Sequence, residues 1–119
     1  MNGWKSWPQI TFLLKITFGD KRAEIASASE PFVGSAPLVL ISVLDYEQLE
    51  KLDYPLHEYF IPWAMYYEAG ASAHNVLLEA TAWGLSGNIT QVEDKDAVCS
   101  LLGLDNERFE PMFVVPVGK

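Results

Sequence analysis

The sequence has little cysteine, few basic residues and no long hydrophobic run, and each shortage excludes a class of protein or site. Cys99 is the one cysteine, so the chain cannot form an intrachain disulfide or a multi-thiolate metal site, and we expect a cytoplasmic protein. Eight basic residues face sixteen acidic ones, and the formal charge of -8 disfavours nucleic acid and anionic membranes as partners. The longest apolar run, residues 36–44, is far shorter than the roughly 18 residues of a membrane span. The first residues also lack the apolar stretch of a secretory signal.

The residues that are present predict one domain over residues 1–119. Half of them are hydrophobic and 20% are charged, so burial of apolar surface can offset the entropy that the chain loses on folding. A chain of 119 residues is long enough for one sizeable core and too short for two. We therefore expect a single folded unit.

The first half of the chain predicts a strand, a helix and a second strand. Residues 9–18 are rich in Ile, Thr and Phe, which is typical of a strand. Asp20 offers an N-cap oxygen to a helix that ends before Pro31, because the residue ahead of a proline avoids the helical conformation. Residues 38–44 form a nearly continuous aliphatic run, which is typical of a central strand covered on both faces. We expect this strand in the middle of the sheet.

The longest helical pattern covers residues 62–83, after a short helix over 46–52 and a packed, irregular linker over 53–62. Pro62 suits the first turn of the long helix, and Gly84 suits its C-terminal cap. The apolar residues at helical spacing that predict its buried face are Ala69, Ala73, Val76, Leu77 and Ala80. We therefore expect an amphipathic helix that packs closely on the sheet.

The last third of the chain predicts an extended stretch and a further helix. The extended stretch covers residues 89–92, and the Thr90-x-x-Glu93 spacing predicts a capping box for a helix over 94–102. Gly103 is expected to stop that helix.

A final strand is expected over residues 111–117 (PMFVVPV). Pro116 has no amide donor, so it should mark a sheet edge or the end of the strand. Together the elements predict an α+β fold in which a small mixed sheet is flanked by helices.

The ionisable side chains predict no metal site. His57 and His74 lie seventeen residues apart without a neighbouring Cys or acidic cluster, so we expect ordinary surface or packing histidines. The acidic residues Glu93, Asp94 and Asp96 are expected to stabilise a helix start rather than to bind a divalent ion.

Four further side chains have an ordinary structural interpretation. Asn75 is expected to be a buried amide satisfied by nearby backbone, and Glu68 a solvated or capping acid rather than a substrate contact. Trp83 should belong to the core. Cys99 should be an inert buried thiol rather than a reactive one.

Several segments occur in an order that resembles nitroreductase-type flavoproteins. Residues 31–41 (PFVGSAPLVLI) resemble their helix-to-strand passage, and residues 68–85 (EAGASAHNVLLEATAWGL) resemble their long inner helix. Residues 101–104 (LLGL) and 111–118 (PMFVVPVG) are similar to their closing helix and final strand. The resemblance covers roughly residues 9–118. Within that family, its motifs most resemble those of the dehydrogenases associated with thiazole and oxazole formation in modified peptides.

The resemblance implies a homodimer that binds flavin mononucleotide (FMN) at the subunit interface and passes hydride from NAD(P)H to a small-molecule or peptide acceptor. A flavin carries the redox step itself, so the lack of a Ser-His-Asp motif does not argue against an enzyme, and no residue is singled out as catalytic. The family's ring-contact loop presents backbone amides to N5 and O4 of the flavin. The matching residues, which are expected to bind the cofactor, are Ser86, Gly87, Asn88, Ile89 and Gln91.

The chain departs from the family pattern at two points. The arginine-rich motif that holds the flavin phosphate has no counterpart, so the fold is expected to be incomplete at its N-terminus. Gln91 and Val92 stand where the family's loop usually has glycines. A second hypothesis therefore stays open: a cofactor-free, degenerate nitroreductase-like module that acts in interaction or scaffolding. The remaining candidates for the phosphate are Lys5, Lys21, Arg22 and Lys119.

Structural roles compete with flavin-related ones at several positions. Gly87 and Asn88 could form a plain turn after the long helix instead of facing a flavin. Trp4, Trp7 and Trp63 could cover a flavin or an aromatic substrate, although we expect core or dimer packing instead.

Overall fold

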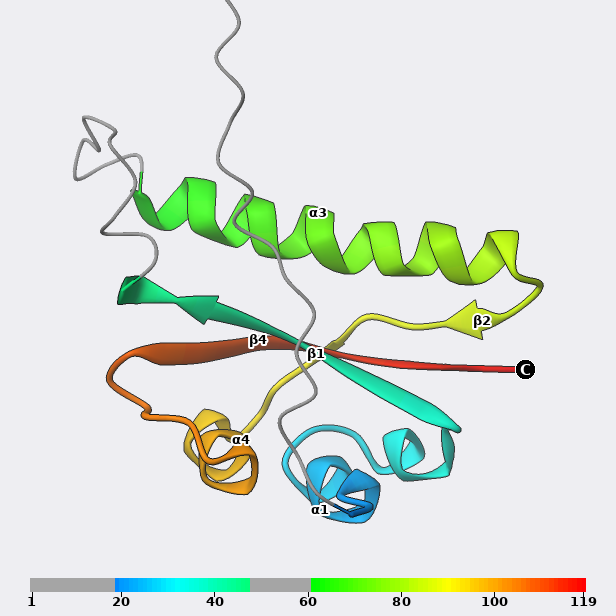
Figure 1. Ribbon diagram of the computed structural model, residues 1–119, viewed down its shortest axis with the longest axis horizontal. Coiled ribbons are helices and arrows are strands. Elements are labelled where there is room, and N and C mark those ends of the chain that lie inside the picture. Colours follow the sequence, from blue (N-terminus) through cyan, green and yellow to red (C-terminus); the bar gives the residue numbers. More distant parts are fainter. Residues whose placement is uncertain (1–18, 48–60) are drawn as a thin grey trace, which may run out of the picture.

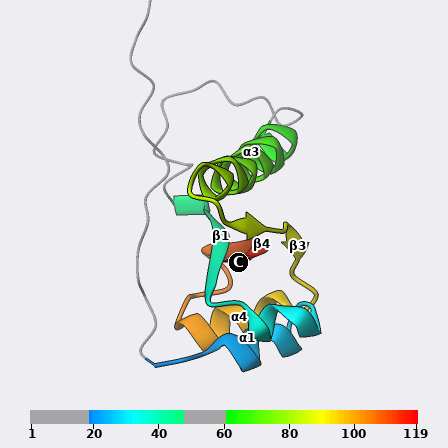
Figure 2. The ribbon, with the colours of Figure 1, turned by 90° about the vertical axis from the view of Figure 1, so that its right-hand side faces the viewer.

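A computed structural model describes residues 19–47 and 61–119 of the chain. These residues form three layers, with a four-stranded sheet between helices (Figure 1). One long helix covers one face of the sheet, and the short helices lie on the other (Figure 2). The predicted α+β fold with a small sheet flanked by helices is confirmed, and the pairings between the described strands are antiparallel. In chain order the elements are α1 (Arg22–Ser27), the 3-10 helix η1 (Pro31–Ser35), β1 (Leu38–Asp45), α3 (Ile61–Ala82), β2 (Ser86–Gly87), β3 (Thr90–Gln91), α4 (Lys95–Leu102) and β4 (Phe109–Gly118).

The last strand, β4, lies in the middle of the described sheet. It pairs with β1 on one side and with β2 and β3 on the other. The prediction that the aliphatic run of β1 is the central strand is therefore wrong for the described part of the chain. The run reflects helices on both faces, which an edge strand can have as well. Val39 and Ile41 pack with residues of α1 and α4, whereas Leu40 packs with residues of α3.

Pro116 lies within this central strand, and the prediction that it marks a sheet edge or a strand end is wrong. β2 and β3 share one register with β4, which places Asn88 opposite Pro116. The Asn88 amide donates to the Pro116 carbonyl at 3.3 Å. Both backbone groups of a residue in an antiparallel strand point to the same neighbour, so the missing N–H of Pro116 faces the gap between β2 and β3. The ladder between β4 and β1 needs no donor there.

The other proline of β4, Pro111, lies at an irregularity in the pairing with β1. Ser42 is opposite Phe113 and Val43 is opposite Pro111, so Met112 is an extra residue in the pairing. Such a β-bulge is one of the few places in a sheet that accept proline.

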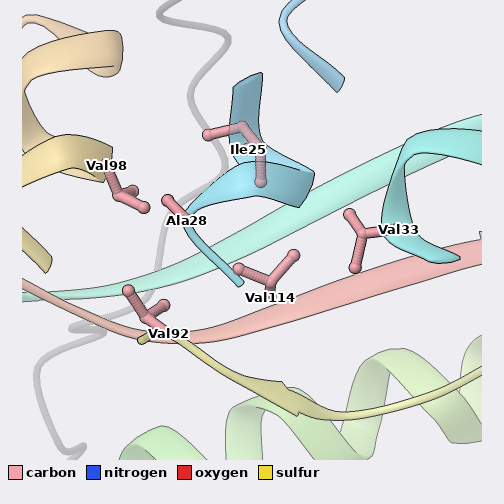
Figure 3. Packing of buried hydrophobic residues seen from close by; sticks show 6 residues of the cluster. All are labelled: Ile25, Ala28, Val33, Val92, Val98 and Val114. Carbon is pink, nitrogen blue, oxygen red and sulfur yellow. The ribbon is translucent and has the colours of Figure 1, made fainter. Parts of the chain in front are cut away.

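The core is divided between the two faces of the sheet. The cluster on the side of α1 and α4 consists of Ile25, Ala28, Val33, Val92, Val98 and Val114 (Figure 3). On the α3 side, Ala73 and Ala80 pack with Val115 and Val117. The predicted small-residue face of the long helix is confirmed, because Ala69, Ala73 and Ala80 are all buried. Small side chains let the α3 backbone approach the sheet.

Glycines follow the ends of α3 and α4 as predicted, with φ of 71° at Gly84 and 68° at Gly103. The prediction that Trp83 belongs to the core is wrong. Its side chain is 74% exposed, and its indole Nε1 donates to Glu79 Oε1 at 2.9 Å. Helical spacing places residue 83 on the buried side, but α3 ends at Ala82 and Trp83 lies in the turn that follows.

α4 starts at a different cap from the one expected. Asp94 is the N-cap, and its Oδ1 accepts a hydrogen bond from the Ala97 amide at 3.0 Å. The predicted capping box is wrong, because Thr90 belongs to β3. The amides of Glu93 and Asp94 donate instead to the Ala28 carbonyl, at 3.0 and 3.2 Å.

The start of α1 agrees in part with the prediction. Asp20 Oδ1 accepts a hydrogen bond from the Arg22 amide at 3.1 Å, although Lys21 occupies the N-cap position. The strand expected over 9–18 lies outside the described residues, as do most of the helix expected over 46–52 and of the linker over 53–62. Among the helices that the structure describes, none has the length and apolar character to cross a membrane.

Candidate functional site

Residues 86–91 form an outer edge of the sheet rather than a loop. β2 and β3 pair with β4 and, within the described residues, with no other strand. The Asn88 amide points to β4. Because an antiparallel ladder alternates, the amides of Gly87, Ile89 and Gln91 point to the opposite side. Residues 86–91, named the cofactor edge below after the role that the resemblance implies for them, thus offer backbone groups that β4 does not use.

An open hollow of about 460 Å³ lies beside the cofactor edge. Its lining comes from three parts of the chain: Glu30 and Phe32 at the start of η1, Asn88, Ile89, Thr90 and Gln91 on the edge, and Phe113 on β4. The Phe32 side chain is 49% exposed, so it offers apolar surface to a ligand. Glu30 is the one ionisable residue of this lining, which gives the hollow an acidic border.

Thr90 brings an unused polar atom to this place. The residue is 6% exposed, and among the described residues its Oγ1 has no hydrogen-bond partner. A buried hydroxyl without a partner costs about 1–3 kcal/mol of folding free energy. Most buried polar atoms are satisfied, so an exception beside a hollow is a reason to look for a ligand.

Gly87 is required by packing on α3. A Cβ at this position would lie 2.8 Å from Leu77 Cδ2 and 3.2 Å from the Pro116 carbonyl oxygen. The φ of Gly87 is not positive, and its backbone belongs to a strand. The alternative of a plain turn at Gly87 and Asn88 is therefore wrong. The glycine lets β2 approach α3.

Of the five basic residues that the structure describes, three are held in ion pairs. Of these three residues, Arg22 is the one that the sequence indicates as a candidate for binding the flavin phosphate. It contacts Asp20 Oδ2 at 2.7 Å and donates to the Ala36 carbonyl at 2.8 Å. Its hydrogen bonds lower the pKa of Asp20 to about 2. The other two pairs are Lys95 with Glu110 at 2.6 Å and Arg108 with Asp45 at 2.9 Å.

The nitroreductase family profile matches residues 6–119 of the chain. The chain belongs to the nitroreductase family. Its fold is similar to that of a nitroreductase family protein from Streptococcus pneumoniae TIGR4, with 22% identity, a TM-score of 0.67, and coverage of 83% of this chain and 64% of that one. It is also similar to CLA-ER, an enone reductase of a gut-bacterial fatty acid saturation metabolism, with 18% identity, a TM-score of 0.66, and coverage of 87% and 65%. The chain thus spans slightly less than two thirds of each of these proteins. Comparison with curated proteins finds no match.

Members of the nitroreductase family generally use flavin, so the cofactor edge can be tested against that group. Outward amides, two phenylalanine side chains, an unpartnered hydroxyl and the adjoining hollow suit a flat ring with polar atoms on its rim. The residues present therefore fit the flavin ring. The paired state of Arg22 makes it a weaker candidate for the phosphate.

The polar side of α3 carries a second open hollow, of about 480 Å³. Its lining residues are Glu68, Ala71, Ser72, Asn75, Val76 and Glu79. Asn75 is exposed, so the prediction of a buried amide is wrong. Its helical spacing from Glu68 and Glu79 puts it on the same side of the helix as these two acidic residues, and not on the alanine face. Glu68 and His74 are exposed, as expected of surface residues.

Cys99 is buried as predicted, at 2% exposure. Burial raises the pKa of its thiol, and the nearby carboxylates of Asp96 and Asp105 add to the effect. A protonated, covered thiol is a poor nucleophile, which supports the interpretation of Cys99 as inert. Within residues 19–47 and 61–119, no group of three His, Cys, Asp or Glu side chains is arranged to hold a metal ion.

A polar cluster at the end of β1 gave no signal in the sequence, because its residues are far apart along the chain. The Tyr46 hydroxyl donates to Glu110, and Lys95 contacts the other carboxylate oxygen at 2.6 Å. Burial raises the pKa of Tyr46, and the bond to Glu110 raises it further. Burial works to raise the pKa of Glu110 as well, but the hydrogen bonds from Lys95 and Tyr46 outweigh it and leave that pKa lowered.

Several predicted residues cannot be compared with the structure. Trp4, Lys5, Trp7 and His57 lie outside the described residues, and the same holds for the side chain of Trp63. The sequence also missed Glu30 and Phe113 as neighbours of the cofactor edge, because no local pattern joins them to it.

Proposed function

We propose that the chain forms the flavin-binding domain, over residues 1–119, of a cytoplasmic FMN-dependent oxidoreductase that passes hydride from NAD(P)H to a small-molecule or peptide acceptor. The observation that carries the proposal is the edge strand 86–91, whose outward amides adjoin a hollow with aromatic lining. When bound, the flavin supplies the hydride transfer, and the protein supplies position and hydrogen bonds. The resemblance to thiazole- and oxazole-forming dehydrogenases favours a peptide acceptor.

The backbone of the cofactor edge would hold the flavin ring. The amides of Ile89 and Gln91 would donate to acceptor atoms on the rim, and Ser86, Gly87 and Asn88 would complete the contact surface. The Gln91 amide belongs to β3, and a donor fixed in a strand need not reorganise when it binds, which makes its electrostatic effect larger. Phe32 and Phe113 would exclude water from these hydrogen bonds, and a lower local dielectric strengthens them.

A homodimer is part of the proposal. Three exposed side chains of α3 and its closing turn, Tyr67, Leu78 and Trp83, are 63%, 57% and 74% exposed. Large exposed apolar groups along one helix are typical of an interaction surface. A second subunit could also bring basic residues to the phosphate, together with Lys5, Lys21 and Lys119 of this chain.

The test is a titration of the purified protein with FMN, followed by quenching of flavin fluorescence. Gln91→Pro removes the outward amide without removing a bond to β4, whereas Gln91→Ala keeps that amide. We expect Gln91→Ala to bind FMN within about twofold of the parent and Gln91→Pro to bind roughly tenfold more weakly, as for one lost hydrogen bond to a ligand. Equal binding by the two variants would place the flavin elsewhere. A 13.3 kDa monomer by light scattering would contradict the homodimer.

A second candidate function is a cofactor-free interaction module. The ion pairs of Arg22, Lys95 and Arg108 favour it, because these cations are already neutralised by neighbouring carboxylates. The same titration separates the two functions. A protein that leaves the fluorescence of FMN unchanged at saturating concentrations, yet stays folded, would support the interaction module.

A further inference from the structure

We propose that Pro116 is a positioning residue, which keeps the peptide between Asn88 and Ile89 free to align with the flavin ring. The inference rests on the flavin-binding function proposed above. Its basis is an interruption of the sheet at the place where the cofactor edge lies opposite Pro116.

β2 and β3 are two parts of one interrupted strand. They pair with β4 in one and the same register, so residues 88 and 89 lie opposite residues 116 and 115. Regular pairing nevertheless stops at residues 88 and 89 and resumes at Thr90. No residue is inserted or removed at the interruption, so the cause is local chemistry rather than a shift of register.

The local cause is the missing amide of Pro116. In a hydrogen-bonded antiparallel pair, two residues exchange two N–H···O bonds. Asn88 donates to the Pro116 carbonyl at 3.3 Å, which is long for such a bond. The return bond cannot form because proline has no N–H. The Asn88 carbonyl therefore has no donor from β4.

The effect is confined to the side of β4 that carries the cofactor edge. On the other side, β1 pairs with β4 without interruption from Leu38 to Ser42, past Val39 opposite Pro116. A proline at position 116 thus removes one bond from the cofactor edge and none from β1. This selectivity accounts for a proline in the middle of a sheet, where it is otherwise rare.

The bond that is lost would have fixed one particular peptide group. The carbonyl of Asn88 and the amide of Ile89 belong to the same planar unit and point in opposite directions. The carbonyl faces β4, and the amide therefore faces away from the sheet. Ile89 itself is one of the residues that line the hollow. Without a donor from Pro116, this peptide can tilt about the strand axis. Its N–H can then follow the position of a ring acceptor instead of the pleat of the sheet.

The test uses Pro116→Val, which restores the donor, and Pro111→Val as the matched control. Pro111 is also a buried proline of β4, but it lies opposite Val43 at the bulge on the β1 side. Two measurements are made on each protein: amide hydrogen exchange by NMR without flavin, and the FMN dissociation constant by fluorescence quenching.

In the parent protein, the Asn88 amide should exchange at least about tenfold faster than the Thr90 amide, although both point to β4. Pro116→Val should abolish that difference, because the ladder becomes continuous, and should raise the FMN dissociation constant by roughly tenfold, because fewer molecules hold the binding geometry. Pro111→Val should leave both quantities within about twofold of the parent.

Two results would overturn the inference: equal protection of Asn88 and Thr90 in the parent, or unchanged FMN affinity in a Pro116→Val protein whose ladder has closed. If Pro116→Val does not fold, Pro116→Ala and the exchange comparison in the parent decide the question. A parent protein that binds no FMN would remove the proposed function, and the inference with it, whereas normal binding by both parent and Pro116→Val removes the inference alone.

Discussion

Replacement of Gly87 by alanine tests how closely the sheet approaches α3. The added Cβ would lie 2.8 Å from Leu77 Cδ2, 3.2 Å from the Pro116 carbonyl oxygen and 3.5 Å from Val117 Cγ2. The Leu77 methyl is the end of a flexible side chain and can move. The Pro116 carbonyl belongs to the central strand and cannot move without disturbing it.

The expected loss of stability follows from two opposing terms. Overpacking of a well-packed site costs about 1–3 kcal/mol. The lower entropy of alanine in the unfolded chain returns about 0.4–1 kcal/mol. We expect Gly87→Ala to lower the free energy of unfolding by about 1 kcal/mol, which corresponds to a decrease in Tm of about 4 °C for a chain of this length.

Gly70→Ala is the matched control. Position 70 lies inside α3, and a Cβ there would meet no atom within 4 Å. Because alanine also has the higher helix propensity, this variant should be more stable than the parent by about 0.5–1 kcal/mol. Urea unfolding of the parent and both variants, with equal m-values, gives the comparison.

A double variant isolates the contact itself. Leu77→Ala removes the methyl group nearest to the added Cβ, so Gly87→Ala should cost less in that background than in the parent. A Gly87→Ala protein as stable as the parent, or a change of stability in the same direction for both glycine variants, would contradict the close approach of β2 to α3.

Three further perturbations have expected outcomes. Asp94→Ala removes the N-cap of α4 and should cost about 1 kcal/mol in urea unfolding, whereas Glu93→Ala, which removes no cap, should change stability by less than half as much. Thr90→Val replaces an unpartnered hydroxyl by a methyl group and should raise the free energy of unfolding by up to about 1 kcal/mol; a large decrease would reveal an undetected partner. Folding lowers the pKa of Glu110 from 4.5, so the unfolded chain binds more protons than the folded chain. The stability that the Glu110 carboxylate contributes is therefore present above about pH 4.5 and is lost as the pH falls below that value. Glu110→Gln should reduce this acid-induced decrease in Tm, and an unchanged pH profile would contradict the assignment.

Local signals in the sequence were sufficient to locate α1, α3 and α4, but they did not predict η1. The spacing of the alanines predicts α3 and its buried face, and Gly84 and Gly103 mark where helices end, because both features act within a few residues. The same reasoning failed at Trp83, where the helix ends one residue earlier than its periodicity suggests. The capping-box prediction failed at Thr90 because the backbone of this residue pairs with β4.

Sheet order could not be predicted, because strand neighbours are chosen by pairing between distant residues. The aliphatic run of β1 indicates that both faces of the strand are covered, but it does not indicate whether strands lie on one side of β1 or on both. Pro116 suggested an edge because a local rule cannot tell which side of a strand lacks a partner. For the candidate site, the resemblance located residues 86–91, but their form as an edge strand and the proximity of Glu30 and Phe113 depend on the tertiary fold.

The central position of β4 has a consequence for how the chain folds. The strand that joins all the others in the described sheet follows all of them in the sequence, so its partner β1 is synthesised much earlier. Tyr46, just after β1, and Glu110 in β4 meet across 64 positions of sequence. Closing so long a loop carries a large entropic penalty, and folds dominated by distant contacts form slowly. During synthesis the aliphatic residues of β1 therefore remain without this partner until residues 109–118 have emerged, and in that interval chaperones and aggregation compete for them.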